Sequence, residues 1–153
     1  MAAFAVSRLH DVTRLGALRD MVHAAFREFT PPSGVLDETL DDFARRLRDE
    51  IVLVAESGGV LVGSMFCARK DESLYLTRMA VPPAWRNRGV GRALLRAAEG
   101  QARGVGLPKL TLRVRQTLPG NRVWFERFGF TVTGEGQEGG RTPYYAMERR
   151  HAP

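Results

Sequence analysis

The chain has 153 residues, of which 44% are hydrophobic and 26% charged, so we expect one domain, residues 1–153, with a buried core. The longest aliphatic run, Ile51 to Ala55, is too short to cross a bilayer, and the N-terminus has no signal-peptide pattern, so we expect no membrane contact and a cytoplasmic location. The single cysteine, Cys67, excludes an intramolecular disulfide, and no His and Cys residues have the spacing of a metal site.

The order of the predicted elements indicates an α+β fold built on a sheet. Hydrophobic periodicity and breaking residues predict a strand at 5–9, helices at 11–29 and 37–48, and strands at 51–56, 60–68 and 73–81. They then predict a helix at 89–103, a strand at 109–115, a helix at 121–128, and strands at 130–133 and 144–148. The order is therefore β-α-α-β-β-β-α-β-α-β-β, with a glycine-rich loop expected at 134–141.

Positive charge is concentrated in the middle of the chain. The net charge is +6, but residues 73–127 hold ten arginines and Lys109 against only Glu99 and Glu126, so this region carries +9 and the remainder −3. A basic region of this kind attracts either nucleic acid or a small polyphosphate. The aromatic residues do not interleave with the arginines as a base-stacking platform requires, which disfavours nucleic acid as a partner.

A glycine motif, Arg86-x-x-Gly89-x-Gly91, lies between the predicted strand at 73–81 and the helix that follows. Glycine lets backbone amides approach a ligand closely, and the first turn of a helix offers unpaired N–H groups and the positive end of the helix dipole. A pyrophosphate fits such a place. The P-loop pattern is absent, and the dinucleotide fingerprint fails because Leu94 occupies its third glycine position.

Three segments together resemble motifs of the GCN5-related N-acetyltransferase (GNAT) family. Leu76–Pro82 looks like the central strand of the family, Arg86–Gly91 its pyrophosphate loop, and Asn121–Phe130 its distal helix with the strand start that follows. The element order agrees from Phe4 to Arg150. The resemblance implies a mixed, mostly antiparallel central sheet flanked by helices. It also implies acetyl transfer from acetyl-coenzyme A to a primary amine by direct attack on the thioester.

The resemblance also implies which residues contact coenzyme A. Backbone N–H groups at 88–92 would hold the pyrophosphate, and the strand edge at 79–81 would pair with the amide-bearing pantetheine arm. Trp124 and Phe125 are expected to pack beneath the cofactor. The implied cofactor-binding residues are Met79, Ala80, Val81, Arg86, Arg88, Gly89, Val90, Gly91, Arg92, Asn121, Trp124 and Phe125.

The implied catalytic groups are less complete. A backbone N–H, that of Val81, is the family-like donor to the oxyanion. Many family members place a tyrosine acid where this chain has Phe125, so Tyr144 or Tyr145 would have to replace it, with Tyr75 a weaker option. No base stands out: Glu28 and His23 lie in the region that borders the acceptor, and a water relay is the alternative.

Three readings therefore remain open at the level of sequence. The first is an N-acetyltransferase whose acceptor is a small amine, an amino acid, an antibiotic or a protein amine, and whose pocket is shaped by residues 11–48 and 134–145. The second is a non-catalytic acyl-coenzyme A sensor of the same fold, which the absent tyrosine favours. The third is a nucleic-acid-binding module, with steeply salt-dependent affinity. A homodimer is plausible by resemblance alone.

Overall fold

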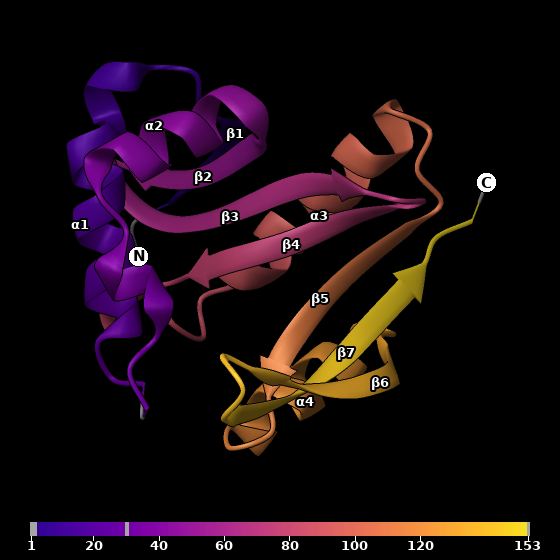
Figure 1. Cartoon of the computed structure of the whole chain (residues 1–153). Coiled ribbons are helices and arrows are strands. Elements are labelled where there is room, and N and C mark those ends of the chain that lie inside the picture. The colour runs from indigo at the N-terminus through magenta and orange to yellow at the C-terminus, as the bar shows by residue number, and fades with distance from the viewer. Residues whose placement is uncertain (1–2, 30, 153) are drawn as a thin grey trace.

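The computed structural model describes residues 3–29 and 31–152, which form one seven-stranded sheet with helices on both faces (Figure 1). The strand order is β1-β2-β3-β4-β5-β7-β6, and every pairing is antiparallel except that of β4 with β5. The expected mixed, mostly antiparallel sheet is confirmed. The strands are β1 (Ala5–Arg8), β2 (Ile51–Ser57), β3 (Val60–Lys70), β4 (Ser73–Ala80), β5 (Lys109–Arg115), β6 (Thr131–Glu138) and β7 (Thr142–Arg150).

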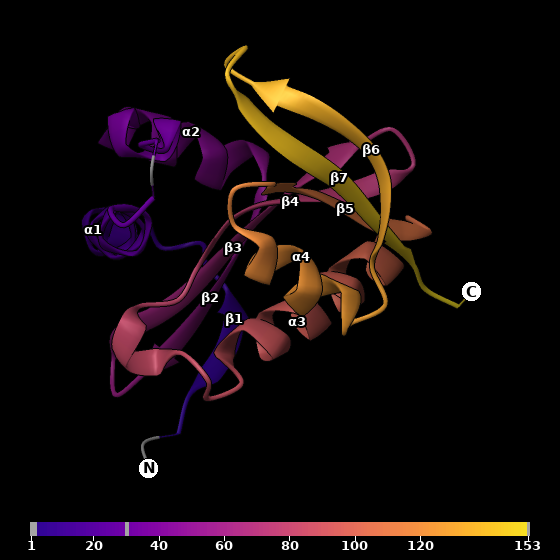
Figure 2. The same cartoon turned by 90° about the horizontal axis from the view of Figure 1, so that it is seen from below.

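The helices divide between the two faces of the sheet (Figures 1 and 2). Helices α1 (Leu15–Phe26) and α2 (Leu40–Asp49) pack on β2 and β3 around Phe43 and Phe66. On the other face, α3 (Val90–Gly104) and α4 (Pro119–Glu126) cover a second core cluster that includes Leu94 and Leu110. Short 3-10 turns, η1 (Val12–Arg14), η2 (Gly34–Asp37) and η3 (Pro83–Trp85), complete the fold. No helix in the described residues is long and apolar enough to span a membrane.

The parallel pair β4 and β5 separates along its length. Their pairing runs only from Ser73 opposite Lys109 to Tyr75 opposite Thr111. Beyond that point β4 keeps its pairs with β3, and β5 keeps its pairs with β7, so the two strands diverge into a V (Figure 1). The edge of β4 from Leu76 onward therefore lacks a neighbouring strand, which leaves its backbone open to a ligand.

The start of α2 differs from the sequence-based expectation. We expected a helix from 37, but residues up to Asp37 form η2, and α2 begins at Leu40. The reason is a capping box at Thr39: the Asp42 N–H donates to Thr39 Oγ1 at 3.2 Å, and the Thr39 N–H donates to Asp42 Oδ2 at 2.9 Å. These two bonds fix the helix start three residues later than the apolar periodicity suggests.

The glycine-rich segment 134–141 is also not the loop that we expected. Strand β6 continues through it to Glu138, and the turn is confined to residues 139–141, where Gly139 and Gly140 have positive φ. Gly136 pairs with Tyr144, and a Cβ at position 136 would clash with the Tyr144 ring. The glycine therefore gives the tyrosine room within the hairpin rather than making the chain irregular.

Candidate active site

The N-terminus of α3 has the features expected of an anion-binding site. Its N-cap, Gly89, has φ +84 and no side chain to occupy the N–H groups of the first turn. Space around Gly89 is open, and Val90 is turned into the core with 1% exposure, so only its backbone faces the loop. The first turn of the helix thus presents backbone donors and the positive end of its dipole to the surface.

The three segments behind the family resemblance meet at Gly91. A Cβ placed there would lie 2.7 Å from Met79 Cε of β4 and 3.2 Å from the Trp124 ring of α4. Gly91 therefore allows the start of α3 to approach both the open end of β4 and the distal helix. A second close approach was not anticipated from sequence: a Cβ at Gly63 of β3 would lie 2.7 Å from Val90 Cγ1. Trp124 and Phe125 pack edge to face beneath this junction, with ring centroids 4.9 Å apart.

The arginines of the glycine loop have different surroundings. The Arg86 guanidinium donates from Nε to the Val81 carbonyl at 3.1 Å and from Nη2 to Glu28 at 2.5 Å. It is therefore bound by the residue that follows β4 and by the second residue after α1. Arg88 is exposed and stacks on the Trp85 ring, with Cζ 4.9 Å from the centroid. Asn121 is exposed on the first turn of α4.

A basic hollow of about 270 Å³ lies beside the first turns of α3. Its charged lining is four arginines against one carboxylate, and Phe128 forms part of its wall: the charged residues are Arg92, Arg96, Glu99, Arg127 and Arg149. Glu99 is engaged by Arg149 at 3.3 Å and by Arg103 at 3.6 Å, so the hollow keeps an excess of positive charge. An exposed phosphate group suits such a place.

The two candidate tyrosines are separated by the sheet. Tyr145 packs against the core cluster under α4, with the Arg122 guanidinium 5.2 Å from its ring centroid. Tyr144 lies on the opposite face, against Gly136, with Arg113 Cζ 4.4 Å from its ring centroid. Only Tyr145 therefore shares a face with Trp124 and Phe125. Tyr75 is half-buried on β4, and its burial raises the pKa of its phenol.

The two regions expected to border the acceptor, residues 11–48 and the β6–β7 hairpin, meet at Arg115. Its guanidinium donates to the Pro31 carbonyl, lies 5.5 Å from the Phe29 ring centroid, and approaches Glu138 at 3.8 Å. A cavity of about 370 Å³ lies on the same face of the sheet, where Tyr75 and Thr111 still pair. Residues distant in sequence thus border the V on this side.

The other acceptor-side candidates are packed or paired. His23 is buried and meets Phe43 edge to face with centroids 6.0 Å apart, while Glu28 is taken by Arg86. Cys67 is buried, and burial raises the pKa of its thiol to about 12, so it stays protonated and unreactive at neutral pH. Within residues 3–29 and 31–152, no group of three His, Cys, Asp or Glu side chains could hold a metal ion.

Comparison with known proteins identifies the family. The sequence model of the acetyltransferase (GNAT) family matches residues 17–130, and the chain belongs to that family. Among solved structures, the fold is similar to PaiA N-acetyltransferase from Thermoplasma acidophilum in complex with coenzyme A, at a TM-score of 0.84 and 16% identity over 97% of this chain and 99% of that one. It is equally similar to Ard1 from Thermoplasma volcanium, at a TM-score of 0.84 and 18% identity over 99% of both chains.

A third structure, ribosomal-protein-alanine N-acetyltransferase from Brucella melitensis, gives a TM-score of 0.79 and 23% identity over 96% of this chain and 99% of that one. At identities this low, the structural similarity establishes a shared fold and nothing beyond it. Acetyl-coenzyme A is the acetyl donor of the family, and the expected family and its cofactor are confirmed.

Two groups next to the site were not anticipated from sequence. Ser64, fully buried on β3, donates from Oγ to the Arg78 carbonyl at 3.1 Å. Arg78 itself pairs with Glu38 across 40 positions of the chain. No local pattern marks either contact, because each depends on which strands and helices become neighbours.

Proposed function

We propose that the chain is an acetyl-coenzyme A-dependent N-acetyltransferase that acetylates a primary amine by direct attack on the thioester. The observation that carries the proposal is the meeting of Met79, Gly91 and Trp124 at the point where β4 has parted from β5. Three segments spread over the chain thus build one site, with an open strand edge beside an uncapped helix N-terminus.

The residues fit coenzyme A part by part. The backbone N–H groups of Gly89–Arg92 would hold the pyrophosphate, since no side chain caps them. The hollow between α3 and α4, rimmed by Arg92, Arg96 and Arg127, suits the 3′-phosphate. The edge of β4 at Met79–Val81 would pair with the amides of the pantetheine arm as an added strand would. Bound acetyl-coenzyme A supplies the acetyl group as an activated thioester.

Two groups would serve the transfer itself. We assign the N–H of Val81, at the end of β4, as donor to the carbonyl oxygen on which negative charge develops as the amine attacks. We assign Tyr145 as the acid that protonates the departing sulfur, because it shares the face of Trp124 and Phe125 whereas Tyr144 does not. His23 is buried and Glu28 is paired, so water is assigned to take the proton of the amine.

The acceptor would enter from the face opposite α3, between the segment after α1 and the β6–β7 hairpin that Arg115 links. One of the similar structures is named for an alanine of a ribosomal protein. A protein amine and a small amine are therefore the two classes of acceptor to compare first.

The decisive experiment combines binding with turnover. Calorimetric titration with acetyl-coenzyme A should give a micromolar Kd, and release of coenzyme A thiol should depend on an amine drawn from a panel of small amines and peptides. Binding without thiol release for any amine would favour an acyl-coenzyme A sensor, which the phenylalanine at position 125 also fits. Failure of the folded protein to bind would refute the enzyme and the sensor together, and a steeply salt-dependent affinity for DNA or RNA would then identify a nucleic-acid-binding module.

A further inference from the structure

Strand β4 carries a bulge at the level of the site. Phe66 of β3 pairs with Thr77, but Ser64 pairs with Ala80, so three steps along β4 oppose two along β3. The extra residue places Arg78 in the left-handed region, with φ +49, which an L-residue adopts only when its surroundings hold it there. As a result the Arg78 side chain reaches the α2 face while that of Met79 reaches Gly91 on the α3 face.

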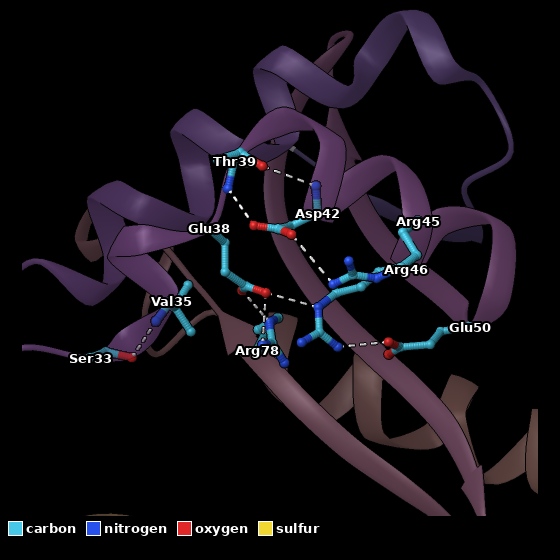
Figure 3. Close-up of polar contacts among 9 residues, drawn as sticks. All are labelled: Ser33, Val35, Glu38, Thr39, Asp42, Arg45, Arg46, Glu50 and Arg78. Carbon is cyan, nitrogen blue, oxygen red and sulfur yellow. Dashed lines mark hydrogen bonds and ion pairs between the residues drawn. The ribbon is translucent and has the colours of Figure 1, made fainter. Parts of the chain in front are cut away.

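The Arg78 guanidinium is bound by the carboxylate of Glu38. The guanidinium donates from Nε to Glu38 Oε1 at 2.6 Å and from Nη2 to Glu38 Oε2 at 3.0 Å, a two-point contact shown in Figure 3. The side chains are only 14% and 12% exposed, so water competes weakly for either partner. Arg46 of α2 donates from Nε to Glu38 Oε2 at 2.9 Å and from Nη1 to Glu50 Oε2 at 2.7 Å, which closes a chain of four alternating charges.

The segment that carries Glu38 is itself fixed by local bonds. Ser33 Oγ accepts from the Val35 N–H at 3.2 Å, and the Glu38 N–H donates to the Val35 carbonyl at 3.1 Å. The capping box of Thr39 and Asp42 follows at once. These bonded turns lie on both sides of Glu38, so they fix the backbone that carries its carboxylate beside β4 (Figure 3).

We propose that Glu38 is a positioning residue of the acetyl-transfer site: it holds the left-handed bulge at Arg78 and thereby sets the direction of the β4 edge at Met79–Val81. The inference rests on the proposed function of that edge as the strand that pairs with the cofactor arm. The bulge lies where β4 no longer pairs with β5, so no second strand fixes the direction of its backbone. Without the carboxylate, Arg78 and Arg46 would be left side by side, and the bulge would lose its only charged anchor among the described residues.

The chain offers a matched control at the far end of the same network. Glu50 is as buried as Glu38, at 12% exposure, and also pairs with Arg46, but it makes no contact with Arg78. We would compare wild type, Glu38→Gln and Glu50→Gln by the Kd of coenzyme A, by kcat and KM with the best acceptor, and by Tm. Glu38→Gln should weaken coenzyme A binding about tenfold and lower kcat at least as much. Glu50→Gln should lower Tm by a similar amount, yet keep the Kd of coenzyme A and kcat within twofold of wild type.

A second pair of variants tests the conformation directly. Arg78→Gly and Arg78→Ala both remove the guanidinium, but glycine adopts φ +49 without strain. Arg78→Gly should therefore bind coenzyme A within threefold of wild type, while Arg78→Ala should bind about tenfold more weakly.

The outcomes separate the two proposals. If wild type binds coenzyme A and the two glutamine variants bind it equally well, or if glycine and alanine at position 78 behave alike, the positioning role is overturned and the proposed function stands. If folded wild type binds no coenzyme A, the proposed function is refuted, and the positioning role with it.

Discussion

The faces of the V that we propose for the cofactor (the cofactor side) and for the acceptor (the acceptor side) are built by different interactions. On the cofactor side, backbone amides at the start of α3 and apolar contacts among Met79, Gly91 and Trp124 define the site. On the acceptor side, ion pairs join distant parts of the chain: Arg78 with Glu38, 40 positions apart, and Arg86 with Glu28, 58 positions apart. The first side depends on steric fit and backbone conformation, and the second on charge. Each should therefore respond to a different kind of change.

Substitution of the N-cap glycine of α3 should give the largest effect. Gly89→Glu forces an L-residue into φ +84 and places a carboxylate where the pyrophosphate would lie, so we expect coenzyme A affinity to fall at least about a hundredfold. Gly100→Glu is the control, because Gly100 is exposed in the same helix with open space around it. Calorimetry should show wild-type affinity for the control. Equal affinity in both variants would show that the phosphate does not bind at the start of α3.

The next effect should come from the tyrosine pair. Tyr145→Phe removes the proposed acid while leaving the cofactor contacts in place, so kcat should fall at least about tenfold with little change in the Kd of coenzyme A. Tyr144→Phe, on the opposite face of the same strand, should leave the release of the thiol unaffected because its ring lies against Gly136. A larger loss of kcat in Tyr144→Phe would show that the acid lies on the acceptor side, and the assignment of Tyr145 as the acid would be wrong.

The same division explains what the sequence could predict. The glycine loop, the strand before it and the order of the elements are local patterns, and each lies where it was expected. Gly89 and Gly91 could be recognised because their spacing is a local pattern typical of a backbone site for phosphate. Whether Met79 to Val81 and the other implied contacts bind coenzyme A stays a prediction.

The acceptor side could not be predicted in this way. Nothing in the sequence around Arg78 signals a left-handed residue, because the bulge is set by pairing with Ser64 and by Glu38. The apolar periodicity places the start of α2 three residues too early, because it does not register the capping box of Thr39 and Asp42 that fixes the helix start. Contacts made by charge between distant residues leave no periodic pattern, so only the fold reveals them.

A smaller effect, on stability, should follow from pH. Burial alone would raise the pKa of Glu38, but the hydrogen bonds and charges of Arg78 and Arg46 outweigh it and hold the pKa below its ordinary value of 4.5. The carboxylate therefore stabilises the folded state above that value, and the stabilisation is lost as pH falls through the lower, folded-state pKa. At pH 7 Glu38→Gln should be less stable than wild type by about 1–3 kcal/mol, a few degrees in Tm, because hydrogen bonds to a charged partner are lost. The gap should narrow as pH falls below 4.5. A gap of unchanged size in strong acid would exclude this carboxylate as its source.

The smallest effect is expected at Arg86, which belongs to the glycine loop but pairs with Glu28 on the acceptor side. The glycine motif predicts that it contacts phosphate, but its guanidinium is held by the Val81 carbonyl and the Glu28 carboxylate, and an exposed ion pair of this kind contributes about 0–1 kcal/mol. Arg86→Ala should therefore weaken coenzyme A binding less than threefold. Glu28→Gln should leave it unchanged or tighten it slightly, because the charge of the arginine is then free to act on the phosphates. A tenfold loss in Arg86→Ala would mean that the arginine exchanges its carboxylate partner for a phosphate when coenzyme A binds. The Arg86–Glu28 ion pair would then exist only in the protein without coenzyme A, and Arg86 would become part of the cofactor side on binding.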